Sequence, residues 1–517
     1  MPGSNLPIGI QSFSEIRTHN YLYVDKTRYI SSLYNTGKYY FLSRPRRFGK
    51  SLFIDTLDCA FSGRKDLFEG LYLTTPDSGW DFEKIYPVLR VDFAGGTIRK
   101  PEDLRERLDR LLDEWEDRFQ TRQTEGSPGE RMLYLIPQIA EISKTQVVLL
   151  VDEYDKPILD NLEDLSVVVN LRDQLKDFYG AIKPLDVYIR FVFLTGVSKF
   201  SKTGIFSGLN NLKDITLDKR YSSICGYTEE DLLTVFRERV TSFDLKEISR
   251  WYNGYSWLGE SVYNPFDILL FFDEGVFRPF WFETGTPSFL LKIWKADPRS
   301  PADYDGMVIG EEILGSFDPE QIRMETLLYQ SGYLTIREWT ADAVRGLSCI
   351  IGYPNIEVRT SLNILFSEAL TGRNITYYRS SLYDLLETEN ISGLHDFFLR
   401  FFASIPHDWY RKNQIARFEG YYASVFYTCF ASLGYQVIPE DTTNHGRIDL
   451  TVQTHNAIWI FEFKVLGPNL GIEKRPLDQI RMKGYAQKYY GTELSVYEIG
   501  VIFDPTIRNI VSWEVGR

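Results

Sequence analysis

The clearest pattern of apolar and polar positions near the start of the chain lies in residues 38–62 (KYYFLSRPRRFGKSLFIDTLDCAFS). It opens with an apolar burst typical of a buried strand and continues with a turn containing Pro45 and Gly49. Apolar residues then recur at helical spacing from Ser51 to Phe61. The segment therefore predicts a strand, a loop and a helix in succession.

Strongly apolar runs continue through the first 215 residues. Residues 147–151 and 187–195 have the composition of buried strands, and amphipathic helices are expected at 101–119 and 131–144. Apolar strands bounded by helices are typical of parallel strands that are covered on both faces. Residues 1–215 therefore predict an α/β domain.

The pattern changes twice in the rest of the chain. Residues 216–370 alternate amphipathic helices with aromatic and Gly/Pro-containing loops, which predicts a mostly helical lid or linker region. Residues 371–517 predict a second α/β domain, in which helices, including one at 419–433, precede short strands. These strands are expected at 435–439, 448–452, 458–465 and 496–503.

Composition limits the class of protein without changing this division. The chain has 517 residues, and 44% apolar and 25% charged residues are usual for soluble globular proteins. This length leaves room for roughly two to four domains. With 58 Lys and Arg against 71 Asp and Glu, the net charge is −13, so any contact with nucleic acid has to be local.

The cysteines and the first residues indicate a compartment. Cys59, Cys225, Cys349 and Cys429 are far apart in the sequence, so they form neither a C-x-x-C zinc motif nor a disulfide framework for a chain of this length. The N-terminal residues lack the pattern of a secretory signal, and no run reaches the roughly 18 apolar residues of a membrane helix. We expect a protein of the reducing cytoplasm with no membrane partner.

The loop of the first segment carries a phosphate-binding pattern. Walker A loops follow G-x4-G-K-[ST], because backbone N–H groups surround the phosphates, Lys reaches the terminal phosphates and the hydroxyl holds Mg²⁺. Here GKS stands at a strand-to-helix junction, whereas Arg44 occupies the position of the first glycine. A basic turn capped by a helix is the alternative. The candidate nucleotide-binding residues are Arg46, Arg47, Phe48, Gly49, Lys50 and Ser51, with Ser51 also a Mg²⁺ ligand.

Polar residues end the two strands predicted further along. Asp152 and Glu153 follow the run 147–151, where Asp152 can hold Mg²⁺ and Glu153 can polarise an attacking water. Thr195 ends the run 187–195, a position suited to sensing the terminal phosphate of ATP. Asp152 and Glu153 can alternatively cap the next helix. The order and spacing of the motifs favour nucleotide binding.

Two apolar strands of the last domain carry isolated charges. Alternation in GRIDLTV places Asp449 on the face opposite its apolar neighbours, and Glu462 and Lys464 share a face of IWIFEFKV. Mg²⁺ or Mn²⁺ between Asp449 and Glu462 would compensate the burial of these carboxylates. Lys464 would orient a water for attack on a phosphodiester. The alternative is an edge pair of Glu462 and Lys464, with Asp449 in a turn.

Neighbouring segments offer further groups for the same site. Glu419 on the preceding helix can complete the metal shell, and Gln479 and Tyr485 on a later helix can contact the substrate. Residues 464–488, which include Lys474, contain six basic and two acidic residues and can hold a phosphate backbone. Solvated surface charges are the alternative for Glu419 and for the basic residues.

Blocks distributed along nearly the whole chain resemble a known bacterial family. This family consists of AAA-ATPase-like proteins that carry a C-terminal PD-(D/E)XK nuclease domain, of the RecB and archaeal Holliday-junction-resolvase type. The RPRRFGKS block is the most specific of the similarities. The blocks are residues 6–10 (LPIGI), 23–27 (YVDKT), 39–51, 151–155 (VDEYD), 251–255 (WYNGY), 281–287 (WFETGTP) and 444–449 (NHGRID).

The resemblance implies a fold for each segment and a role for the candidate residues. It implies a P-loop NTPase α/β sandwich at 1–215, the helical region at 216–370 and a restriction-endonuclease-like PD-(D/E)XK domain at 371–517. ATP would be bound by Lys50 and Ser51 with Mg²⁺ at Asp152. The nuclease core would comprise Glu419, Asp449, Glu462 and Lys464, supported by Gln479 and Tyr485. The chain departs from the motifs at Ile448, in place of proline, and at Arg44.

These observations predict an ATP-binding and ATP-hydrolysing protein coupled to a metal-dependent nuclease. The expected cofactors are ATP and Mg²⁺ or Mn²⁺, and the expected partners are DNA and a second copy of the chain. One alternative is a nucleotide-switched signalling or defence scaffold whose nuclease-like domain binds nucleic acid or protein without cleavage. Another is an ATP-driven remodeller of proteins.

Overall fold

The computed structural model describes residues 5–199, 205–206, 208–282, 288–296, 299–315, 322–344, 346–405, 419–467 and 475–516. The chain forms two compact units, Met1–Leu290 with Val308–Asn355 and Leu291–Met307 with Ile356–Arg517. The predicted middle region is thus divided between the two units, and the domain boundaries drawn at residues 215 and 370 remain predictions. Lys474 and residues 283–287 lie outside the described residues.

The first unit contains a five-stranded sheet with the strand order β2-β3-β4-β1-β5. Each pair of neighbouring strands is parallel. β3 is buried along its whole length, as expected for a parallel strand covered on both faces. The strands are β1 Tyr39–Ser43, β2 Val88–Asp92, β3 Val147–Asp152, β4 Ile189–Gly196 and β5 Lys213–Asp214.

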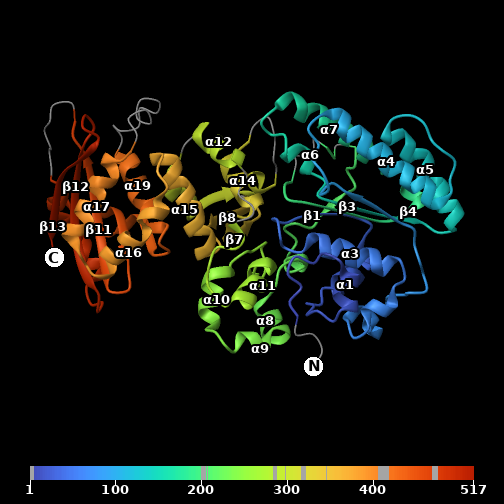
Figure 1. Cartoon of the computed structure of the whole chain (residues 1–517), viewed down its shortest axis with the longest axis horizontal. Helices are drawn as coiled ribbons and strands as arrows, with labels where there is room; N and C mark the ends of the chain where they lie inside the picture. Colours follow the sequence, from blue (N-terminus) through green and yellow to red (C-terminus); the bar gives the residue numbers. More distant parts are fainter. Residues whose placement is uncertain are drawn as a thin grey trace. The chain divides into compact units, whose positions relative to one another are not determined.

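Helices cover both faces of this sheet (Figure 1). They are α1 Phe13–Thr18, α2 Arg28–Thr36, α3 Lys50–Phe61, α4 Pro101–Phe119, α5 Pro128–Ser143, α6 Lys156–Leu159 and α7 Leu165–Gly180. α1 and α3 lie on one face, and α4, α5 and α7 lie on the other. The predicted α/β character of the N-terminal segment is confirmed. The sequence did not predict β2, a five-residue strand interrupted by Arg90.

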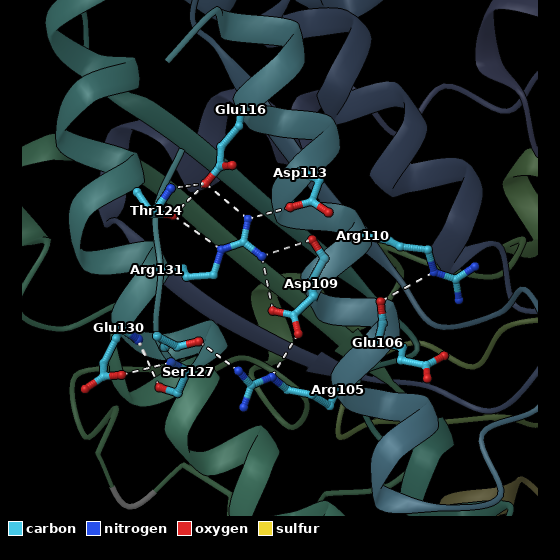
Figure 2. A network of polar contacts seen from close by, with 12 residues as sticks. Arg105, Glu106, Asp109, Arg110, Asp113, Glu116, Thr124, Ser127, Glu130 and Arg131 are labelled. Carbon is cyan, nitrogen blue, oxygen red and sulfur yellow. Dashed lines mark hydrogen bonds and ion pairs between the residues drawn. The ribbon is translucent and has the colours of Figure 1, made fainter. Parts of the chain in front are cut away.

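Local signals explain how α5 begins and how it is held to α4. Ser127 Oγ accepts from Glu130 N at 3.2 Å, and the Glu130 carboxylate accepts from Ser127 N at 2.8 Å, forming a capping box. Arg131 is buried and joins the two helices through carboxylates of α4 (Figure 2). Its partners are Asp109 at 3.1 Å, Asp113 at 2.7 Å and Glu116 at 3.1 Å.

The first unit continues with short helices and a second, smaller sheet. This sheet has the order β6-β8-β7, with β7 and β8 antiparallel. The sequence predicted a mostly helical region here, because β7 (TIREWTAD) is largely exposed and lacks an apolar run. The elements of the first unit here are α8 Glu229–Val235, α9 Arg237–Val240, α10 Leu245–Tyr252, α11 Pro265–Glu274, β6 Met307–Gly310, α13 Glu311–Leu314, α14 Met324–Ser331, β7 Thr335–Asp342 and β8 Gly346–Gly352. α12 Ser288–Ala296 begins in the first unit and continues into the second from Leu291.

The second unit contains a five-stranded mixed sheet with the order β13-β12-β11-β10-β9. β11 and β12 are parallel, and the other pairs are antiparallel. The elements are α15 Ile356–Thr371, α16 Arg379–Glu387, α17 Ile391–Ala403, α19 Glu419–Ala431, β9 Gln436–Thr443, β10 Gly446–Gln453, β11 Ala457–Val465, α20 Pro476–Lys483, β12 Ser495–Asp504 and β13 Asn509–Gly516. Within the described ranges, no helix is long and apolar enough to cross a membrane.

The alternation of side chains along β11 decides which helix each residue faces. Phe461 and Phe463 pack on Phe426 of α19, with ring centroids 5.7 and 4.9 Å apart. Ile458 and Ile460 belong to a buried cluster with residues of α20. Glu462 and Lys464 continue the series of Ile458 and Ile460, so they lie on the α20 face. The helix at 419 and the four strands predicted in this domain are confirmed, whereas the half-exposed edge strand β13 was not predicted.

Candidate functional site

The loop between β1 and α3 has the backbone of an anion-binding turn. Gly49 and Arg47 have left-handed φ angles of 91° and 67°, and α3 begins directly afterwards at Lys50. Such turns, followed by a helix, direct backbone N–H groups toward one point and favour negative charge there. Ser51 lies in the first turn of α3, as the Walker A pattern requires.

Lys50 is buried within this loop. Its Nζ donates to the carbonyl oxygens of Arg44 at 2.9 Å and Pro45 at 2.8 Å. Burial lowers the pKa of Lys50, and the nearby carboxylates of Asp152 and Glu153 oppose this shift. A cation that is held by neutral carbonyls can exchange them for phosphate oxygens without leaving the loop.

The predicted residues at the ends of β3 and β4 lie together. Thr195 Oγ1 donates to Asp152 Oδ1 at 2.7 Å, and both side chains are buried. Glu153 follows in a left-handed conformation with φ 51°, which is strained for a residue with a side chain. Burial and the charge of Asp152 raise the pKa of Glu153.

Asp155 is a further carboxylate at this edge that the sequence reasoning did not single out. Its Oδ2 accepts from Val197 N at 3.0 Å and from Ser198 N at 2.5 Å, so it fixes the segment after β4. Burial raises the pKa of Asp155 to about 6. Its position two residues after Glu153 in VDEYD was the available signal.

A mainly apolar cavity of about 60 Å³ lies beside Gly49. Its walls come from the segment before α2, from the start of α3 and from residues 224–227. Aromatic and apolar groups form most of the lining, and Lys26 adds a charge. The aromatic and apolar lining residues include Tyr23, Val24, Phe48, Leu52, Phe53 and Tyr227.

The second candidate site lies on β10 and β11. The two strands pair through Leu450 and Phe461, so Asp449 and Glu462 are opposite each other one position further along. Asp449 Oδ2 accepts from Phe463 N at 2.7 Å. The predicted convergence of Asp449 and Glu462 is therefore present in the sheet.

Lys464 connects the carboxylates of this site. Its Nζ lies 3.3 Å from Glu462 Oε1 and 3.2 Å from Glu419 Oε1 at the start of α19. Burial opposes the charge of Lys464, but Asp449, Glu462 and Glu419 raise its pKa above the usual value. Burial raises the pKa of Asp449 to about 6, and burial together with Asp449 raises that of Glu462 to about 8.

The helix α20 brings Gln479 to the same carboxylate. Gln479 Nε2 donates to Glu462 Oε1. Burial raises the pKa of Tyr485, and a hydrogen bond with the Gln479 side chain partly opposes this shift. Gly500 of β12 pairs with Glu462 of β11. It allows α20 to approach the sheet, because a Cβ at position 500 would lie 2.6 Å from Leu477 N. Gln479 and Tyr485 thus contact the carboxylate site itself, whereas direct contact with a substrate remains a prediction.

The donor set fits a divalent cation. Glu462 Oε2 is buried and has no hydrogen-bond partner among the described residues. Carboxylate oxygens are the ligands that Mg²⁺ and Mn²⁺ prefer. Within the described part of the chain, no three acidic, His or Cys side chains already enclose a metal-sized space.

The basic residues near this site are mostly paired with acidic ones. Arg475 lies 3.7 Å from Glu514, Arg481 lies 3.5 Å from Glu498, and Lys488 forms an ion pair with Asp441. Lys483 is exposed. These pairs favour the alternative of solvated surface charges over a dedicated phosphate-binding patch.

Comparison with known proteins adds two domain families. Residues 7–206 match the model of a family described as predicted AAA-ATPase, and residues 417–513 match that of the PD-(D/E)XK nuclease superfamily. A protein of Azotobacter chroococcum mcd 1, described as an uncharacterized protein in the vnfD 5' region, is 45% identical over 518 residues. The similarity covers 100% of this chain and 99% of that relative.

Proposed function

The chain belongs to the family of AAA-ATPase-like proteins that end in a PD-(D/E)XK nuclease superfamily domain, and from this premise we propose that it has two activities. The first unit binds and hydrolyses ATP. The second unit cleaves phosphodiester bonds of nucleic acid, with DNA as the expected substrate. ATP controls or drives the cleavage.

The nucleotide half is supported by the groups around the β1–α3 loop. Backbone N–H groups at the start of α3 receive the phosphates, and Lys50 exchanges loop carbonyls for phosphate oxygens. Asp152, which accepts a hydrogen bond from Thr195, would bind Mg²⁺, and Glu153 would accept a proton from the attacking water.

The nuclease half is supported by the chain's own polar groups on the α20 face. Asp449 and Glu462 would hold a divalent cation, which would supply charge stabilisation at the phosphate and a more acidic water. Lys464 places a positive charge beside the reacting phosphate, and Glu419 orients the Lys464 ammonium group. Gln479 fixes the Glu462 carboxylate, which keeps the ligand in one rotamer.

One observation carries the nuclease proposal. Glu462 Oε2 is buried without a hydrogen-bond donor among the described residues, opposite Asp449 on the neighbouring strand. An unpartnered carboxylate oxygen costs free energy in the interior, and a second carboxylate beside it increases that cost. A bound cation removes both penalties, so the arrangement is suited to metal binding rather than to stability alone.

The direct test is an incubation of the full chain with a panel of labelled single- and double-stranded DNA and RNA. Cleavage is expected with Mg²⁺ or Mn²⁺ and is expected to stop with a chelator. Parallel reactions with and without ATP show whether the nucleotide controls cleavage. An intact panel under all conditions, with ATP turnover unaffected by nucleic acid, would contradict the nuclease half.

Metal binding is expected to release a proton from Glu462. Because its pKa is raised to about 8, this carboxyl is protonated at pH 7 and has to ionise to bind a cation. Mn²⁺ affinity should therefore rise by up to about tenfold per pH unit between pH 6.5 and 8 and level off above that. Calorimetry in buffers of different ionisation enthalpy measures the number of protons that are released when Mn²⁺ binds. Affinity that is constant over this range would contradict the prediction.

A further inference from the structure

Arg44, at the position of the first Walker A glycine, is a fully buried guanidinium at the end of β1. Its Nη1 donates to the carbonyl oxygens of Ser43 at 2.8 Å and Thr216 at 3.0 Å. Its Nη2 donates to the carbonyl oxygen of Tyr221 at 3.1 Å. The arginine therefore fastens the first position of the loop to the backbone of residues 216–221.

The surroundings of Arg44 are specific for a guanidinium. Its Cζ lies 4.0 Å from the ring centroid of Trp257, so the planar group stacks on the indole face. Burial lowers the pKa of Arg44 to about 10, which leaves it charged at neutral pH. A lysine has neither the planar fork nor the stacking surface, so it cannot reproduce these contacts.

The same residue forms part of the Lys50 site. The carbonyl oxygen of Arg44 accepts from Lys50 Nζ, so fixing the Arg44 backbone also fixes where the lysine ammonium lies. The far end of the loop is fastened in a similar way, because Gly226 N donates to the carbonyl oxygen of Phe48 at 3.1 Å. The loop is thus attached at both ends to the segment that follows β5.

We propose that Arg44 is a positioning residue of the nucleotide site, which replaces the flexible glycine turn of a Walker A loop by a fixed anchor. The inference rests on the proposed ATP binding. Arg44 contacts no phosphate itself. It holds the loop open at the angle that directs the N–H groups and Lys50 toward one anion, and Trp257 supports it.

The test is the affinity of the full chain for a non-hydrolysable ATP analogue, measured by calorimetry for wild type, Arg44→Met and Arg44→Lys. Both variants are expected to raise the Kd by about tenfold or more, with Lys giving little rescue. Arg131→Met is the matched control, because Arg131 is also a buried arginine of this unit but joins α4 to α5 (Figure 2). It is expected to lower the melting temperature and leave the Kd unchanged.

Each result decides the matter. A folded Arg44→Met variant with the wild-type Kd would overturn the inference. If this variant does not fold, Trp257→Leu replaces it, and an increased Kd that Trp257→Phe restores would support the anchor. Wild-type affinity in both Trp257 variants would then overturn it. Failure of the wild type to bind the analogue would instead remove the proposed nucleotide site, and the anchor's role with it.

Discussion

Glu462→Gln is expected to reduce metal-dependent cleavage by roughly a thousandfold, which corresponds to about 4 kcal/mol of lost transition-state stabilisation. The amide has nearly the same shape but carries no negative charge, so the cation loses a ligand. The fold should be preserved, because the substitution removes a buried carboxyl that lies beside Asp449. Initial cleavage rates and chemical unfolding, measured on the same preparations, separate the two effects.

The matched control for this prediction is Glu387→Gln. Glu387 is a partly buried carboxylate of the same unit, and it accepts hydrogen bonds from Tyr435 and from His455, which lies in the turn between β10 and β11, seven residues before Glu462. This variant should cleave at the wild-type rate. Wild-type cleavage rates in both variants would show that cleavage does not need the Glu462 carboxylate, whereas equal losses in both would show a general effect of removing a carboxylate.

Lys50→Ala is expected to weaken ATP binding by at least about a hundredfold, equal to about 2.8 kcal/mol. The loss follows from removing a buried ammonium that is positioned to exchange two loop carbonyls for phosphate oxygens. ATP turnover should fall to the background rate. Calorimetry with ATP and a phosphate-release assay measure the two quantities.

Lys38→Ala is the control for the loss of a lysine. Lys38 directly precedes β1, at the end of this strand that is opposite the β1–α3 loop, and it pairs with Asp186 at 2.7 Å. It is therefore remote from the loop. Its removal should leave the ATP affinity unchanged. Unaltered ATP binding by Lys50→Ala would contradict the proposed nucleotide site and would not affect the proposed nuclease site.

Much of the fold could be predicted because its signals are local. The apolar run 147–151 ends in Asp152, and its β-branched and apolar residues alone are enough to predict a buried strand without knowledge of the rest of the sequence. The alternation around Asp449 and Glu462 likewise predicts a shared face, because β10 and β11 are joined by a short turn. In contrast, β7 and β13 are partly exposed strands, and their weak alternation gave no clear signal.

The parts of the candidate sites that could not be predicted depend on contacts between distant residues. Arg44 and Thr216 are 172 positions apart in the sequence. From the sequence alone, Arg44 is only a mismatch to the Walker A pattern, because the carbonyl groups that it binds cannot be identified there. Gln479 reaches Glu462 because Gly500 allows α20 to approach the sheet. A count of charged residues in the sequence also cannot show that the basic residues near α20 form ion pairs with acidic residues.

The proposed nuclease activity of the second unit depends on Asp449 and Glu462 binding one divalent cation together. The most direct test is an anomalous diffraction map of crystals of the full chain soaked with Mn²⁺. We expect a peak at coordination distance from both carboxylates, roughly 2.0 to 2.5 Å. A map without a peak there, from protein that cleaves nucleic acid with Mn²⁺ in solution, would contradict this proposal.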